Sequence, residues 1–529
     1  MRRMWKAAAG AALAVGAALA APAAGAVDAV GVVEEGVEVD GERIDEWMQD
    51  RMGAHGIPGA AVAVVRGGEV VHLAGYGVAD PEGTPVTPHT PFVIGSASKP
   101  FTAMVVRQLV QEGELSLQDR VEPYLSGLVE EMPAGFEDVT VGQLLNHTGG
   151  LGMEVGLAGT VEVHEGEDAL DRRVAELLDQ PLAREPGQEW EYSNAGAMLL
   201  AAVVEQVTGE RFADQLRGRV FDPLQMSDSF ASEEDPRAEA LATGHWSWFG
   251  QWRASGLPYD NAGVAMGYIG SSAHDLARFL QAHLGHHDGP GVIPATAAEM
   301  AAGPVADTGW DFPLEGGYGL GWFVDDLGGE PVVSHSGSLG HFTAHLVMAP
   351  GADDLGVAVL SNASAFVASG HEGQYDLSLG LTRMLLDQDP EPTTASPLMT
   401  VVVPVACWAL PVLLTVAAAR FLLVTRRRYA GTVQASRRVW ARLVALPAAA
   451  YLALGAVILT TVPLASARHF YPDAGWGLTV SAYLALSWAV LRTVLAATAL
   501  TSATRKPGAD TATGEHRSAR RPQPVPLTR

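Results

Sequence analysis

The chain has 529 residues, enough for more than one domain, and its charge divides sharply along the sequence. Residues 398–529 hold 15 lysines and arginines against 3 aspartates and glutamates, so 19 of the 34 basic and 57 of the 60 acidic residues precede position 398. An acidic surface repels polyanions, so we expect no nucleic-acid partner. The single cysteine, Cys407, excludes an intramolecular disulfide and a cysteine-based metal site.

The N-terminal segment, residues 1–26, has the parts of a secretory signal. A basic start precedes an alanine-rich apolar stretch and the small-residue end Ala24-Gly25-Ala26. This pattern predicts cleavage after Ala26, with an uncleaved anchor as the alternative. Residues 27–41 are acidic and without periodicity, which is typical of a linker. We therefore expect the body, residues 42–389, to lie outside the cytoplasm.

The body has apolar, β-branched runs at both ends and helical periodicity between them. The expected strands are residues 60–65, 69–76, 331–334, 342–349 and 355–360, and the clearest helices are residues 100–111, 141–145 and 195–207. Runs from both chain ends in one antiparallel sheet place those ends side by side. The predicted fold class is α+β: an antiparallel sheet flanked by helices, plus a mostly helical subdomain.

After a proline-rich linker, residues 390–397, the sequence changes to long apolar stretches. Residues 398–424, 443–464 and 477–500 are each long enough to cross ~30 Å of hydrocarbon, which predicts three transmembrane helices within residues 398–504. The loop between the first two stretches is rich in arginine. Because cytoplasmic loops carry an excess of basic residues, this loop and the C-terminus are expected in the cytoplasm. The basic tail, residues 505–529, is expected to be disordered. The lipid bilayer is thus a predicted partner of a multi-pass cell-membrane protein.

The strongest chemical signal is Ser96 and Lys99, three residues apart where a helix is expected to begin. The sequence has only three lysines, and the other two, Lys6 and Lys506, lie in the leader and the tail. A buried lysine can become neutral and act as a base, which arginine cannot do. Residues three apart share a helix face, so a hydroxyl and an amine are expected to meet there.

Two further motifs bear polar groups of the right kind. Tyr192 and Asn194 stand in a short loop before a helix, where the phenol can move a proton and the amide can orient a substrate. The alternative is a simple helix cap. His335, Gly337 and Ser338 follow an apolar run, and the Ser338 N–H is expected to join that of Ser96 in binding an oxyanion.

The ordered motifs Ser-x-x-Lys, Tyr-x-Asn and His-x-Gly resemble the class C β-lactamase and D-alanyl-D-alanine carboxypeptidase family of serine hydrolases. The stretch Leu144 to Leu151, which contains His147, is also similar to that family. His147 itself is interpreted as a turn residue. The resemblance implies that Ser96 is the nucleophile, with Lys99 and Tyr192 as the proton-handling pair. It also implies substrate binding by Asn194, His335, Gly337 and Ser338.

His335 stands where many β-lactamases have a lysine, which favours the peptidase and esterase members. Carboxylate binding there is expected to be weak or pH-dependent. We therefore expect a membrane-tethered extracytoplasmic serine hydrolase that forms an acyl-enzyme on an ester, amide or D-alanyl peptide. It would need no cofactor and no metal. The alternative is a penicillin- or peptidoglycan-sensing receptor, acylated at Ser96 without efficient turnover.

Overall fold

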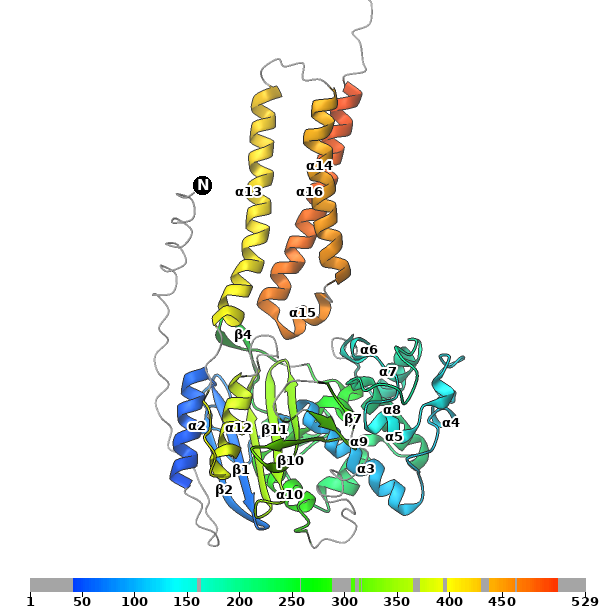
Figure 1. Cartoon of the computed structure of the whole chain (residues 1–529), viewed down its shortest axis with the longest axis vertical. Coiled ribbons are helices and arrows are strands. Elements are labelled where there is room, and N and C mark those ends of the chain that lie inside the picture. Colours follow the sequence, from blue (N-terminus) through cyan, green and yellow to red (C-terminus); the bar gives the residue numbers. More distant parts are fainter. Residues whose placement is uncertain are drawn as a thin grey trace, which may run out of the picture. The chain divides into compact units, whose positions relative to one another are not determined.

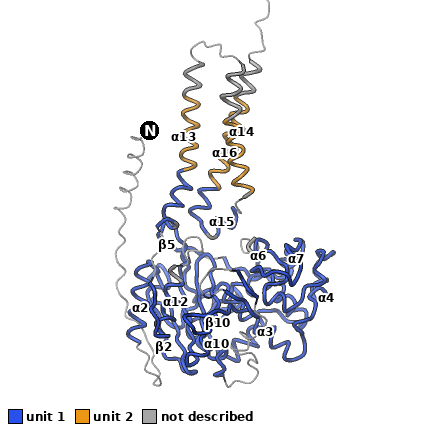
Figure 2. Tube along the Cα trace, in the orientation of Figure 1, with its two compact units in different colours: residues 1–409, 463–478 blue, residues 410–462, 479–529 orange. Residues whose placement is uncertain are grey.

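The computed structural model describes residues 41–502, with gaps at 159–162, 257, 288–305, 310–313, 315, 365–371, 393–396, 430–436 and 462–463. The expected signal peptide, most of the first linker and the C-terminal tail lie outside the described residues. The described chain forms two compact units (Figure 2): residues 1–409 with 463–478, and residues 410–462 with 479–529.

The first unit is built on an antiparallel sheet of eight strands among the described residues (Figure 1). The strands, in spatial order, are β2 (Glu69–Gly77), β1 (Gly59–Arg66), β12 (Leu355–Ser361), β11 (Phe342–Ala349), β10 (Glu330–Leu339), β9 (Phe323–Leu327), β8 (Gly317–Tyr318) and β7 (Ala306–Asp307). The pairing of β1 with β12 confirms that the two chain ends of the body lie side by side. Strands β7, β8 and β9 were not expected from the sequence.

Both faces of the sheet are buried, which explains why β1 is apolar at nearly every position. Its odd-numbered residues Ala61, Ala63 and Val65 pack into the larger core, while its even-numbered residues face a second core. Helices α2 (Gly41–His55) and α12 (Glu372–Leu385) pack against each other over this second core, where Trp47 Nε1 donates to the carbonyl of Leu377 at 3.1 Å. Helix α10 (Ala273–His283) packs on β1 and β12 within the larger core.

The helical part extends the larger core around α8 (Asn194–Thr208), a helix buried over its first ten residues after Asn194. Its neighbours are α3 (Lys99–Glu112), α4 (Glu122–Leu125), α5 (Val141–Leu145), α6 (Met153–Ala158), α7 (Ala169–Leu178) and α9 (Phe212–Leu216). The three helices expected from the sequence are therefore confirmed. Two short sheets complete this unit: β3 (Phe92–Val93) with β6 (Gly270–Ser271), and β4 (His245–Trp248) with β5 (Gln251–Ala254) and β13 (Ala363–Ser364).

The C-terminal part contains α13 (Val403–Tyr429), α14 (Arg437–Thr461), α15 (Leu464–Phe470) and α16 (Pro472–Ser502). Within the described residues, two segments are long and apolar enough to cross a membrane, residues 400–423 and 472–495. The described apolar stretch of α14, Pro447–Thr460, is shorter than the ~20 residues that a span requires. The structure thus supports two of the three expected spans by length and composition.

Candidate active site

Ser96 lies in a 3₁₀ turn, η1 (Gly95–Ser98), that joins β3 to α3. Gly95 has a φ of +55°, which lets the chain turn sharply from the strand into the helix. Pro100 occupies the first turn of α3, where a missing N–H costs no hydrogen bond. The side chain of Lys99 then returns over the preceding turn, and its Nζ donates to the Oγ of Ser96 at 3.1 Å. The expected contact between hydroxyl and amine is therefore present.

Lys99 is buried without a carboxylate beside it. Its Nζ also donates to the Oδ1 of Asn194 at 2.8 Å and to the carbonyl of Met266 at 2.9 Å, and its exposed fraction is 3%. Among the described residues no Asp or Glu lies within ion-pair distance of it. Burial therefore lowers the pKa of Lys99 well below its ordinary value. Such an amine can be neutral at working pH and accept a proton.

The Met266 carbonyl comes from a π-helical segment, Val264–Tyr268. Two hydrogen bonds join this segment and the residue after it to α3 and to the turn before α3. Thr102 Oγ1 donates to the carbonyl of Ala265 at 2.8 Å, and the N–H of Ile269 donates to Ser98 Oγ at 3.3 Å. Buried hydrogen bonds of this kind hold an acceptor in place because breaking them leaves polar groups unpaired. Residues 264–268 show no periodic pattern, so this segment was not expected in the site.

Tyr192 and Asn194 reach the same place from the loop before α8. Ser193 is extended and precedes the helix, so Asn194 begins α8 and its amide oxygen meets Lys99. Lys99 Nζ lies 4.8 Å from the centroid of the Tyr192 ring, within the range of a cation–π contact. The Tyr192 ring is parallel to that of Phe323 at 6.4 Å. The structure therefore brings together four residues that are up to 98 positions apart in the sequence, Ser96, Lys99, Tyr192 and Asn194.

Strand β10 runs directly against η1, and Gly337 makes this possible. A Cβ at Gly337 would lie 1.9 Å from the carbonyl oxygen of Ile94, and one at Gly95 would lie 2.6 Å from the Ser338 nitrogen. The two backbones thus touch through a pair of glycines. Ser338 Oγ is 2.7 Å from Ser364 Oγ. The Ser338 backbone nitrogen is therefore held next to the turn that carries Ser96.

His335 is completely buried and bonded within the protein. Its Nδ1 must carry the proton, because it contacts the carbonyl of Ser336 at 2.7 Å, so its Nε2 accepts from the Tyr318 hydroxyl at 3.1 Å. Burial, followed by the positive charge of Lys99, lowers the pKa of His335 to about 3. This imidazole stays neutral near pH 7. A pH-dependent cationic contact from His335 to a substrate carboxylate, one of the sequence-based expectations, is not favoured by this geometry.

His147 was expected to be only a turn residue, and the structure also places it in the site. It has a φ of +60° and lies among aromatic rings, with ring centroids at 4.6 Å to Tyr192, 4.5 Å to Tyr318 and 6.2 Å to Trp190. Its Nδ1 accepts the N–H of Ser193 at 3.3 Å, so its proton is on Nε2, which has no partner among the described residues. Burial and the charge of Lys99 lower the pKa of His147 well below its ordinary value.

A separate hollow in the first unit lies between α7, α8 and α9, and Ala201, Glu205 and Arg211 are among its lining residues. Val264 and Ala265 of the Met266 segment line its wall, but Ser96, Lys99, Tyr192, Asn194 and His335 do not. The polar groups described above lie instead around Ser96, in the turn η1 that contacts strand β10.

A hydroxyl beside a buried amine can act as an activated nucleophile, and comparisons with known proteins show to which family the chain belongs. The sequence matches the Beta-lactamase family over residues 44–379. It is 32% identical to "Penicillin-binding protein 4" of Amycolatopsis lactamdurans over 306 residues, which is 56% of this chain and 79% of that protein. The chain belongs to the beta-lactamase family.

Solved structures show the same architecture. The octameric penicillin-binding protein homologue from Pyrococcus abyssi has a TM-score of 0.56 and 28% identity, covering 67% of this chain and 79% of that one. EstCE1, a hydrolase with promiscuous acyltransferase activity, has a TM-score of 0.54 and 24% identity, covering 64% and 96%. At that identity EstCE1 supports the fold alone. The α+β class with an antiparallel sheet and flanking helices is therefore confirmed.

Proposed function

We propose that this protein is a serine hydrolase that acts through an acyl-enzyme on Ser96. The observation that carries the proposal is the 3.1 Å contact from Lys99 Nζ to Ser96 Oγ, made by an amine whose pKa burial lowers well below its ordinary value. A neutral Lys99 takes the hydroxyl proton as Oγ attacks an ester or amide carbonyl. The new Oγ–C bond forms as the carbonyl electrons move to the oxygen.

The oxyanion is bound by the backbone N–H groups of Ser96 and Ser338. The close approach of β10 to η1 through Gly337 supports this assignment, because it holds Ser338 N beside the nucleophile turn. Donors fixed before the reaction stabilise developing charge without reorganisation, and each is worth about 10²–10³ in rate. His335 contributes by holding the Tyr318 hydroxyl, a positioning role.

The proton on Lys99 then passes to the leaving group as the tetrahedral intermediate collapses. Tyr192 lies over the lysine and completes the proton-handling pair, while Asn194 holds Lys99 through Oδ1 and offers its NH₂ end to a substrate carbonyl. Water deacylates Ser96 by the same groups used in reverse. The substrate is an ester, an amide or a D-alanyl peptide, as the similarity to a penicillin-binding protein supports.

We place the catalytic domain outside the cell membrane, tethered by α13, α14 and α16 as three spans with the C-terminus inside. Residues 400–423 and 472–495 support two of these spans, and the arginines at 426–428 and 437–438 support the orientation. These helices also keep open the receptor alternative, in which acylation of Ser96 persists and alters the membrane region.

The test uses the full chain purified in detergent, with a chromogenic cephalosporin, a short-chain nitrophenyl ester and a D-alanyl-D-alanine peptide. Intact-protein mass spectrometry follows acylation while absorbance or released D-alanine follows turnover. We expect Ser96→Ala to abolish both, and Ser126→Ala, at an exposed serine, to change neither. Turnover retained by Ser96→Ala contradicts the proposal. A stable adduct with one equivalent and no further turnover on any substrate supports the receptor instead.

A further inference from the structure

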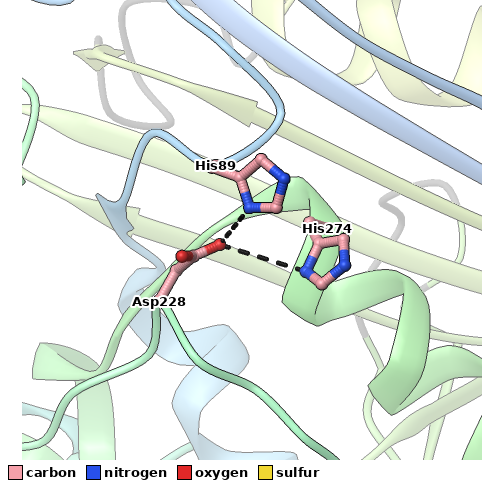
Figure 3. A group of neighbouring side chains, drawn as sticks. All are labelled: His89, Asp228 and His274. Atoms are coloured by element: carbon pink, nitrogen blue, oxygen red, sulfur yellow. Dashed lines mark hydrogen bonds and ion pairs between the residues drawn. The ribbon is translucent and has the colours of Figure 1, made fainter. Parts of the chain in front are cut away.

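A second group of polar side chains shares no residue with the Ser96 site. His89 lies in the loop before β3, Asp228 in the loop after the π-helical segment Arg217–Phe221, and His274 in the first turn of α10 (Figure 3). One ligand atom from each of the three lies within 4.8 Å of the other two. We propose that His89, Asp228 and His274 form a binding site for a divalent transition-metal ion such as Zn²⁺.

The donor set suits such an ion. Two imidazoles and one carboxylate are common zinc ligands, and a water completes a tetrahedron when a site opens to solvent. Asp228 Oδ2 is 2.8 Å from His89 Nδ1 and 4.0 Å from His274 Nδ1. Ligands around tetrahedral zinc lie about 3.4 Å apart, given bonds of about 2.1 Å. The His89 side chain is more than half exposed, so its ring is free to rotate and bring its nitrogen to this spacing.

Hydrogen bonds from neighbouring residues orient Asp228 and His274, the two less exposed ligands. Ser272 Oγ donates to Asp228 Oδ2 at 2.8 Å, which fixes that carboxylate. Asp275 Oδ1 is 3.0 Å from His274 Nδ1, and Asp275 Oδ2 accepts from the N–H of Asp228 and the hydroxyl of Ser229, each at 2.8 Å. Asp275 contacts the same ring nitrogen of His274 that faces Asp228, so Nδ1 must give up this hydrogen bond to bind an ion. Asp275 is a positioning residue for Asp228, because its Oδ2 accepts from the Asp228 N–H.

Charge gives an independent reason for a cation here. Two carboxylates, Asp228 and fully buried Asp275, meet within one hydrogen-bonded group. Among the described residues neither has a lysine or arginine within ion-pair distance, and their cationic partners are the imidazoles alone. A divalent cation held by Asp228 places positive charge beside both carboxylates.

The competing explanation is that the carboxylates only cap α10 and hydrogen-bond to the two imidazoles. The N-terminus of a helix favours negative charge, and the Ser272 hydroxyl does accept the N–H of Asp275 at 3.1 Å. A helix cap needs neither imidazole, whereas here the two rings pack with centroids 4.5 Å apart and their Nδ1 atoms lie 2.8 and 4.0 Å from one Asp228 oxygen. This convergence of three donor atoms is what a shared cation explains.

The ion at this site would stabilise the fold and would take no part in the reaction at Ser96. His274 and Ser272 directly follow β6, whose residue Ser271 pairs with Phe92 of β3, and β3 leads into the Ser96 turn. A bound ion ties the loop before β3 to the start of α10. Because the ion binds the folded chain, it stabilises that chain by mass action.

The experiment uses the tag-free full chain in detergent, freed of metal with a chelator. Titration with Zn²⁺ is followed by calorimetry, Co²⁺ binding by its visible absorption, and thermal unfolding with and without Zn²⁺. We expect one saturable site, a tetrahedral cobalt spectrum and a higher Tm with zinc. His89→Ala and His274→Ala should each weaken zinc binding at least tenfold. His89 is exposed, so its variant should fold normally.

The matched control is His286→Ala. His286 forms a similar partly exposed pair with Asp354 at 2.8 Å but has no third ligand in the described structure, so zinc binding should be unchanged. Equal zinc binding by wild type, His89→Ala and His274→Ala overturns the proposal, as does the absence of saturable binding. Loss of binding in His286→Ala but not in His89→Ala also overturns it, because the ion would then bind at the other pair.

Discussion

Gly337 lies so close to Ile94 that a methyl group in place of its hydrogen would sit 1.9 Å from the Ile94 carbonyl oxygen. Real Cβ atoms do not approach backbone this closely, so the contact requires glycine. The close approach of strand β10 to the nucleophile turn η1 therefore depends on the lack of a side chain at Gly337. The consequences for the Ser96 site can be tested one residue at a time.

Gly337→Ala should separate β10 from η1 and move Ser338 N away from the oxyanion position. We expect kcat/KM to fall by about 10² or more, the cost of losing one such donor. The measurement is ester or peptide turnover beside Tm. Gly127→Ala is the matched control, because Gly127 has open space around its Cβ position, and should keep activity within about twofold. Full activity in Gly337→Ala would show that β10 does not bind the oxyanion.

Lys99→Met should abolish acylation, because methionine fills similar space but has no base. It removes the desolvation cost of the buried amine but leaves the Asn194 amide oxygen and the Met266 carbonyl without their donor, so the two effects on stability oppose each other. Lys99→Arg keeps the charge but cannot become neutral, so it should also lose about 10²–10⁴ in rate. The test is single-turnover acylation followed by mass spectrometry, with Tm as the control. Activity in Lys99→Arg would mean that the charge, not the base, is required.

His147→Leu should destabilise the loop before α8, because it leaves the buried N–H of Ser193 without its acceptor. An unpaired buried donor costs about 1–3 kcal/mol, so Tm should fall by several degrees. His147→Gln, with an amide oxygen that can accept, should recover part of this loss. Chemical denaturation and KM against kcat separate the structural effect from the catalytic one. Equal stability of all three proteins would exclude the hydrogen bond as important.

Acid should destabilise the first unit through its buried histidines. Burial lowers the pKa of His283 to about 4, His335 to about 3 and His341 to about 4, from the ordinary 6.5. Below pH 6.5 the unfolded chain binds protons that the folded chain excludes, so stability is full above pH 6.5 and falls as the pH drops. Each histidine contributes up to about 1.4 kcal/mol per pH unit.

The measurement is Tm of the full chain from about pH 7.5 to pH 4.5. His283→Gln should flatten this dependence, since His283 is fully buried and holds the Phe279 carbonyl through Nδ1 at 2.9 Å. Ser126→Ala, at an exposed residue that does not titrate in this range, is the control and should keep the wild-type slope. A slope that His283→Gln does not alter would assign the acid sensitivity to other groups.

Local periodicity predicted the sheet strands β1, β2, β11 and β12 and the helices α3, α5 and α8 closely. Strands β7 and β8 have two residues each, too short for an alternating pattern to appear. The π-helical segment around Met266 has no sequence period of its own and exists because α3 and α8 pack on it. His147 was missed because a turn explained its neighbours, and only packing shows the three aromatic rings around it.

The sequence by itself determined the family pattern, the apolar C-terminal stretches and the pairing of Ser96 with Lys99, because each depends on local spacing, length or composition. The tertiary structure decided what those residues experience. Burial lowers the pKa of Lys99, His335 becomes a neutral support for Tyr318, and Gly337 brings β10 against η1. These properties depend on desolvation and on contacts between distant segments, which no spacing along the chain specifies.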